Sequence, residues 1–108
     1  MTFSVRNLPR AEADIRCIAN YIHQRSSGGA AAWLNALDVA CNRLAVNAKS
    51  YGEADENEFF DIDVKQALFK TKKGRVYRIV FTIVEAEVLI LRVRGSGQAP
   101  VRPDDTDR

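Results

Sequence analysis

The sequence predicts an α+β fold in which a two-helix hairpin packs on one sheet, formed by a short N-terminal strand and a three-stranded antiparallel meander. Two observations predict it. In the first half of the chain, apolar residues recur every three or four positions, which is the helical period. In the second half, apolar and polar residues alternate in three runs, which is the strand period. The helices bury one apolar face each, and the sheet supplies the surface that covers them.

Length and composition predict a single domain. With 108 residues, 46% of them apolar, the chain can bury one hydrophobic core. We expect the domain to span residues 1–98 and residues 99–108 to form a frayed or disordered tail, because that segment has little to bury. No stretch reaches the roughly 18 apolar residues of a membrane span, and the N-terminus lacks the layout of a secretory signal. We therefore expect a cytoplasmic protein that does not associate with membranes.

A short strand over residues 3–7 and an amphipathic helix are expected first. Pro9 suits the first position of that helix, because its missing N–H would be unpaired there in any case. Asp14 falls on the polar face of the helix. The apolar face is expected to consist of Ala11, Ile15, Ile18, Ala19 and Ile22.

The second helix is expected after the interruption at residues 26–29. Ser27 is a suitable cap, because its hydroxyl can accept a hydrogen bond from a free N–H of the first helical turn. The short interruption predicts that the two helices form a hairpin. The apolar stripe is expected to consist of Trp33, Leu37, Ala40 and Leu44, widened by Leu34 and Cys41.

Three strands are expected over residues 64–71, 76–84 and 88–94, after an acidic loop. Residues 72–74 supply the first turn, and residues 85–87 supply the second, although no glycine is present there to take a positive φ. Alternation predicts that one set of side chains faces the helices while the arginines point away from them. The set expected to face the helices is Tyr77, Ile79, Phe81, Ile83, Leu89, Leu91 and Val93.

The register of the last two strands depends on the length of the loop between them. A two-residue loop would pair Ile83 with Val88 and turn the arginines of the last strand into the core. A three-residue loop pairs Val84 with Val88 and places Phe81 opposite Leu91, which keeps the arginines outside. We therefore expect the second register. The pairs expected on the outer face are then Arg78 with Arg94 and Val80 with Arg92.

Two arginines opposite each other repel, so Arg78 and Arg94 need an anion over them. The residues leave two sources open. The chain can neutralise the pair itself, or an external polyanion or acidic protein can do so. The internal candidates are Asp61, Asp63, Asp104 and Asp105.

Three further cations are candidates for the same surface. Either Lys65 or Lys70 joins the arginines, because the alternation of that strand is ambiguous. Arg75, in the turn, is placed to contact phosphates or to serve solubility alone. We expect no metal and no cofactor, because one histidine and two cysteines without paired spacing do not make a metal site.

Three segments of the chain resemble the RelE/ParE toxin superfamily, and its ParE branch in particular. The likeness covers about residues 3–98, in the family's order of elements. The segments are AEADIRCI at 11–18 followed by Tyr21, GRVYRIVF at 74–81 and VLILRVRG at 88–95. The resemblance implies the toxin of a type II toxin–antitoxin system. It also implies a cognate antitoxin whose flexible segment wraps the toxin, giving an oligomer of the two proteins.

The branches of the superfamily differ in their targets. RelE-like members are ribosome-dependent mRNA endonucleases, and for a nuclease the resemblance implies catalytic roles for Arg78, Tyr77 and Arg94. The chain lacks two features of the nuclease pattern, a basic residue directly after the last strand and a Tyr or His near the C-terminus. No Tyr or His follows Tyr77. RNA cleavage needs a general base and a general acid, and arginines are poor proton shuttles. The nuclease interpretation therefore loses weight.

We therefore expect a ParE-like toxin that acts on DNA gyrase as a binding protein and not as an enzyme. A RelE-like endonuclease that acts on mRNA at the ribosome is one alternative. A non-toxic module that binds through its basic sheet face is another. The residues expected to bind the target or the antitoxin are Arg78, Arg92, Arg94, Lys65, Lys70 and Arg75.

Overall fold

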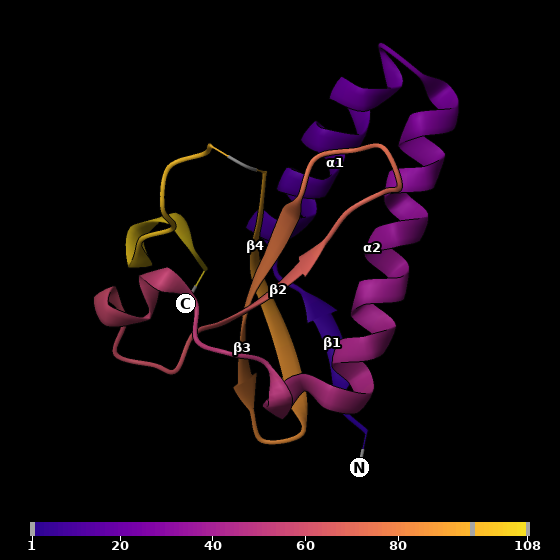
Figure 1. Cartoon of the computed structure of the whole chain (residues 1–108). Coiled ribbons are helices and arrows are strands. Elements are labelled where there is room, and N and C mark those ends of the chain that lie inside the picture. The colour runs from indigo at the N-terminus through magenta and orange to yellow at the C-terminus, as the bar shows by residue number, and fades with distance from the viewer. Residues whose placement is uncertain (1, 96, 108) are drawn as a thin grey trace.

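The computed structural model describes residues 2–95 and 97–107 and confirms the expected α+β class (Figure 1). The strands are β1 (Ser4–Asn7), β2 (Lys65–Phe69), β3 (Tyr77–Val84) and β4 (Glu87–Gly95), in the order β1-β4-β3-β2. β1 runs parallel to β4, and the other neighbours are antiparallel. α1 (Pro9–His23) and α2 (Ser27–Asn47) form the hairpin, with the short 3-10 helices η1 (Ala48–Ser50), η2 (Asp55–Phe59) and η3 (Pro103–Asp105) beside the sheet. No helix in this described part of the chain is long and apolar enough to cross a membrane.

The helical hairpin begins and ends close to where the sequence predicts. Pro9 is the first residue of α1, as expected. The cap of α2 is Ser26, and the prediction of Ser27 is wrong by one residue. Ser26 has extended backbone, and its Oγ accepts a hydrogen bond from the Gly29 N–H at 2.9 Å. Ser27 already belongs to the helix, so its hydroxyl is too far along the turn to serve as the cap.

The main core lies between the hairpin and the sheet. Trp33, Leu37, Ala40 and Leu44 of α2 are buried there, as expected. Trp33 packs against two rings of the sheet, with ring centroids 5.4 Å from Tyr77 and 5.7 Å from Phe69. Leu34 does not widen the stripe, because 40% of its surface is exposed. Ile15, Ile18 and Ile22 of α1 pack against the edge of this core and are half-buried.

A β-bulge in β4 changes the expected register. The loop has two residues, Glu85 and Ala86, so Val84 pairs with Glu87 and Glu85 takes a φ of 57° without being glycine. Val80 pairs with Arg92, but the next pair is Phe81 with Ile90, which leaves Leu91 as an extra residue.

The bulge reconciles the two registers that the sequence offered. Between the bulge and the loop, the pairing is the one that a two-residue loop predicts. On the other side of the bulge, Arg78 is opposite Arg94, as expected. An extra residue places two consecutive side chains on one face. The prediction that Leu89 and Leu91 face the helices is therefore wrong, and Val88 and Ile90 take those places.

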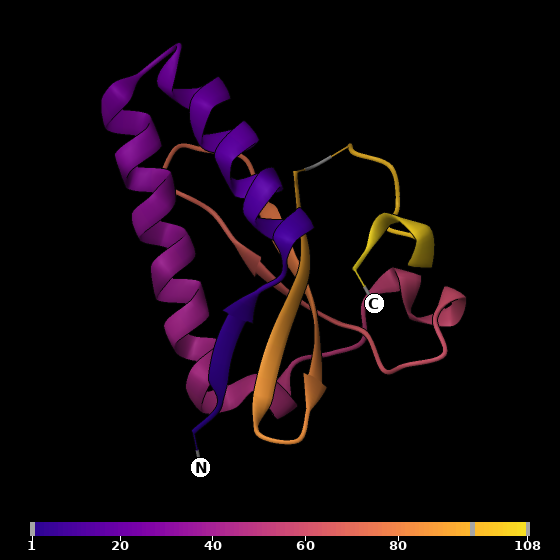
Figure 2. The ribbon, with the colours of Figure 1, turned by 180° about the vertical axis from the view of Figure 1, so that it is seen from behind.

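A second, smaller apolar cluster lies on the face of the sheet away from the helices. η2, η3 and the C-terminal segment gather on this side (Figure 2). Residues 99–107 thus differ from the frayed or disordered tail that we expected, because Val101 is fully buried in the cluster. Arg108 lies outside the described residues. The buried members of the cluster are Leu8, Ala54, Val64, Val80, Leu89, Leu91 and Val101.

The identity of the α2 cap gives a direct test. Substitution Ser26→Ala removes the acceptor of the Gly29 N–H and is expected to lower the free energy of unfolding by about 1 kcal/mol. Ser27→Ala is the matched control and is expected to change it by less than about 0.5 kcal/mol. Urea unfolding followed by far-UV circular dichroism measures both. An equal loss in the two variants would contradict the assignment of the cap.

Candidate functional site

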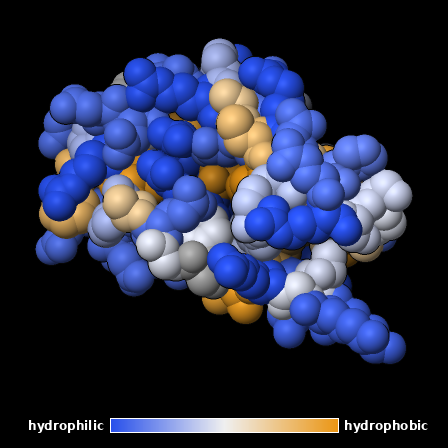
Figure 3. Space-filling view, turned by 90° about the horizontal axis from the view of Figure 1, so that it is seen from above, coloured by the Kyte–Doolittle hydropathy of each residue, from blue (hydrophilic) through white to orange (hydrophobic). Residues whose placement is uncertain are grey.

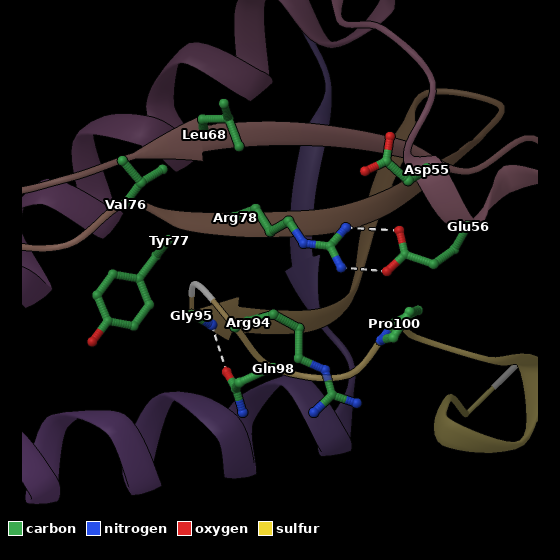
Figure 4. Close-up of a pocket in the computed structure, with 11 residues that line it drawn as sticks. Asp55, Glu56, Leu68, Val76, Tyr77, Arg78, Arg94, Gly95, Gln98 and Pro100 are labelled. Carbon is green, nitrogen blue, oxygen red and sulfur yellow. Dashed lines mark hydrogen bonds and ion pairs between the residues drawn. The ribbon is translucent and has the colours of Figure 1, made fainter.

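Three arginines lie on the face of the sheet away from the helices, and we call this surface the arginine face. Arg78 of β3 is directly opposite Arg94 of β4, and Arg92 is opposite Val80. A hollow of about 300 Å³ lies over the ends of these strands, next to the Arg78 and Arg94 side chains (Figure 4). Its rim includes Leu68 and Val76, which are 62% and 41% exposed.

Arg78 is held by a buried carboxylate. Its Nη1 donates to Glu56 Oε1 at 2.7 Å, and its Nη2 donates to Glu56 Oε2 (Figure 4). Glu56 belongs to η2, is 1% exposed, and its Oε2 also accepts from the Val101 N–H at 2.8 Å. Burial alone would raise the pKa of Glu56, but the hydrogen bonds from Arg78 and Val101 outweigh it and hold that pKa at about 2. Glu56 is therefore ionised at neutral pH.

Arg92 is held by α1. Its Nε and Nη2 each donate to the Asp14 carboxylate at 2.7 Å. β1 pairs with β4 only as far as Ile90, so the N–H of Val93 is at an edge that no strand covers. Asp14 Oδ2 accepts that N–H at 3.0 Å. Asp14 thus neutralises Arg92 and closes the edge of β4 at once, as natural sheets require.

Arg94 is the least satisfied of the three arginines. Its Nε is buried without a hydrogen-bond partner among the described residues. Its nearest carboxylate is Asp105, with Nη2 and Oδ2 4.0 Å apart, at the limit of an ion pair. A buried guanidinium nitrogen without an acceptor is unfavourable, because it has lost water without gaining a bond. Arg94 is therefore the group best able to accept an anionic ligand.

The chain itself supplies a close anion to two of the three arginines, Arg78 and Arg92, and leaves Arg94 with a distant one. Of the four carboxylates expected from the sequence, Asp105 reaches the arginine face, and Asp63 lies 4.0 Å from Lys65 instead. Glu56 and Asp14 do most of the neutralising, and the sequence did not identify them. Glu56 is one of several acids in a loop, and Asp14 was expected on a solvated helix face. No periodic pattern marks either residue.

The lysines expected near the arginines lie elsewhere. Lys65 is opposite Phe81, on the helix side of the sheet, and its Nζ donates to the Tyr51 backbone carbonyl at 3.0 Å. Lys70 follows the end of β2 and lines a separate hollow beside α2. The side of β2 that faces Arg78 carries Leu68. The structure therefore brings neither lysine to Arg78.

Arg75 lies near the α1–α2 turn and lines a different hollow from the one beside Arg78 and Arg94. It lines a hollow of about 390 Å³ with Tyr21 of α1, Trp33 of α2 and Tyr77. Seen from this end of the molecule, the surface is mostly hydrophilic, with small apolar areas between the polar side chains (Figure 3). Arg75 is thus available to a partner, but by a different hollow from the one beside Arg94.

The residues expected for a nuclease do not form a catalytic group. The Tyr77 ring points away from the two guanidinium groups and packs beside Trp33 and Phe69 (Figure 4). The Arg78 guanidinium is occupied by Glu56. Within residues 2–95 and 97–107, no group of three or more His, Cys, Asp or Glu side chains could hold a metal ion.

The comparisons with known proteins agree with the resemblance seen in the sequence. The model of the family described as "ParE toxin of type II toxin-antitoxin system, parDE" matches residues 5–100. The match includes the three arginines and Glu56, and residues 101–107 lie beyond it. Comparison with curated proteins gives no match.

The buried pair of Arg78 and Glu56 predicts a large, non-additive effect on stability. Arg78→Met leaves the Glu56 carboxylate buried without its partner and is expected to cost about 3–5 kcal/mol. Adding Glu56→Gln removes that charge, while the amide oxygen can still accept the Val101 N–H. The double variant is therefore expected to recover at least half of the loss. Chemical unfolding at pH 7 measures both variants, and equal losses would contradict the role of the pair.

The same pair predicts a pH dependence. The pKa of Glu56 is about 2 in the folded protein, below its ordinary 4.5, so the unfolded chain binds more protons between these values. The stabilisation is therefore complete above about pH 5 and is lost as the pH falls toward 2. The stability difference between the wild type and the double variant, measured by urea unfolding from pH 7 to pH 3, is expected to shrink over this range. A constant difference would contradict the lowered pKa of Glu56.

Proposed function

From the membership of the chain in the ParE toxin family of type II toxin–antitoxin systems, we propose that this protein arrests bacterial growth by acting on DNA gyrase in the cytoplasm. The observation that carries the proposal is the family match over residues 5–100. ParE toxins pair with a cognate antitoxin, which neutralises them. The target contact and the antitoxin contact are both assigned to the arginine face and its hollow.

The chemistry of the site supports a binding protein over a nuclease. Cleavage of RNA requires a group that takes a proton and a group that gives one. Glu56 has a pKa of about 2 and is bound to Arg78, so it is a weak base and carries no proton to donate at neutral pH. The half-buried Tyr77 ring packs against the helix–sheet core. The hollow can bind an anion, but these residues do not make an acid–base pair.

The composition of the hollow indicates the type of contact. Arg94 offers a guanidinium that lacks a close anion, while Leu68 and Val76 at the rim expose apolar surface. Interfaces commonly combine an arginine with an apolar centre, because the arginine adds directional bonds to the area that is buried. We assign Arg94 as the main polar contact and Leu68 with Val76 as the apolar contact.

Induction of the chain alone in bacteria tests the proposal. Incorporation of labelled thymidine is expected to fall before that of labelled leucine, because gyrase inhibition stops replication first. Arg94→Ala is expected to weaken the effect about tenfold, the equivalent of about 1.4 kcal/mol of binding free energy. Arg43→Ala, an exposed arginine of α2, is the matched control and is expected to leave it unchanged.

Each of the other outcomes would assign a different function to the chain. If leucine incorporation falls first, the gyrase target is wrong, and cleaved mRNA would then identify a RelE-like endonuclease. If neither falls although the folded protein accumulates, the chain is a non-toxic binding module. Supercoiling by purified gyrase, measured with the wild type and Arg94→Ala, separates direct inhibition from an indirect effect on replication.

A further inference from the structure

The C-terminal segment places one acidic residue, Asp105, on the arginine face. We define residues 103–107, which have the sequence PDDTD, as the acidic cap. Asp105 Oδ2 lies 4.0 Å from Arg94 Nη2, and the Asp105 backbone carbonyl accepts from Arg92 Nη1 at 2.7 Å. The chain thus covers Arg92 and Arg94, two of its candidate binding residues, with its own acidic segment.

The cap also binds Arg10, at the start of α1. The Asp104 carbonyl accepts from Arg10 Nη1 at 2.6 Å, and Asp107 Oδ2 accepts from the Arg10 backbone N–H at 3.0 Å. Arg10, Arg92 and Arg94 therefore form one cationic surface beneath the cap. The cap binds this surface with carboxylates and backbone carbonyls together. A ligand that fits the surface therefore offers both groups, as an acidic peptide does.

The cap can leave the surface without opening the core. Val101, just before it, is fully buried in the second cluster and is also held by Glu56. Arg102 stacks on Phe59, with its guanidinium carbon 4.1 Å from the ring centroid. Within the cap, the Pro103, Asp104 and Asp107 residues are exposed, and the buried residue is the polar Thr106. Detachment beyond Arg102 would therefore expose little apolar surface.

We propose that the acidic cap occupies the docking site of a short acidic peptide segment of the partner antitoxin, and that the partner binds by displacing it. The proposal deepens the assignment of the arginine face made above and rests on it. A peptide is favoured over a nucleic acid, because two of the hydrogen bonds from the arginines are accepted by backbone carbonyls.

Displacement lowers the affinity of the partner in a defined way. A partner segment binds only molecules whose cap is open, so its apparent dissociation constant is the intrinsic value divided by the open fraction. We expect Arg78 to be unaffected, because its partner Glu56 belongs to η2 and not to the cap. The cap therefore regulates Arg92 and Arg94 of the arginine face, together with Arg10 of α1.

Titration with a synthetic copy of the cap tests the proposal. The probe is the pentapeptide PDDTD with blocked ends, and the readout is the NMR signal of the Arg94 Nε–H. A variant that ends at Arg102 is expected to bind the pentapeptide at least about tenfold more tightly than the full chain, because it has no internal competitor. The peptide PNNTN is expected to lose this binding.

A full-length variant guards against loss of folding in the shortened chain. Asp104→Asn, Asp105→Asn and Asp107→Asn together weaken the cap and are expected to let the pentapeptide bind as in the shortened variant. The matched control neutralises the exposed acids Asp38, Glu58 and Asp61 and is expected to behave as the wild type.

The outcomes separate this proposal from the proposed function. Equal binding of PDDTD to all variants, or no binding to any, would overturn displacement. Tighter binding of oligothymidylate than of PDDTD to the opened variants would assign the surface to nucleic acid and overturn the peptide. The peptide titration requires neither gyrase nor growth arrest. Its result can therefore be interpreted even if the gyrase proposal fails. Conversely, growth arrest by the wild type with no displacement would leave the toxin assignment intact.

Discussion

The opposition of Arg78 and Arg94 is the constraint on which the outer half of the molecule depends. Antiparallel pairing of β3 and β4 fixes their distance, and like charges at that distance need anions. Glu56 meets this need for Arg78, so η2 must lie against the sheet. Its carboxylate then accepts the Val101 N–H, which draws the C-terminal segment over the same face. One unfavourable pair thus organises two segments that contain no strand or long helix.

Much of the fold follows from periodicity, and its failures occur where periodicity carries no signal. The helices were predictable because both apolar stripes have the helical spacing and Pro9 marks a start. The bulge could not be predicted, because residues 88–91 are all apolar. Either face of the strand is then apolar in this stretch, and the sequence gives no sign of an extra residue. The bulge allows β4 to serve two apolar clusters, one on each face, within nine residues.

The candidate site was predictable in its cations and not in its anions. Alternation alone identified the shared face of Arg78, Arg92 and Arg94. Glu56 reaches Arg78 across 22 positions of sequence and Asp14 reaches Arg92 across 78, so their roles depend on packing that no local pattern encodes. Composition suggested that the tail would fray, but one buried valine and a series of polar contacts hold it.

The parallel pairing of β1 with β4 has a consequence for how the chain folds. Ser4 pairs with Glu87, so the first strand has no neighbour until the last has formed. The helical hairpin can form early from local contacts, but its apolar side stays exposed to water until β2, β3 and β4 have formed and packed on it. Contacts of such large sequence separation slow folding, because the loop entropy is lost before the pairing energy is gained. We therefore expect β1 to join the sheet late in folding, when the second half of the sequence already forms the meander.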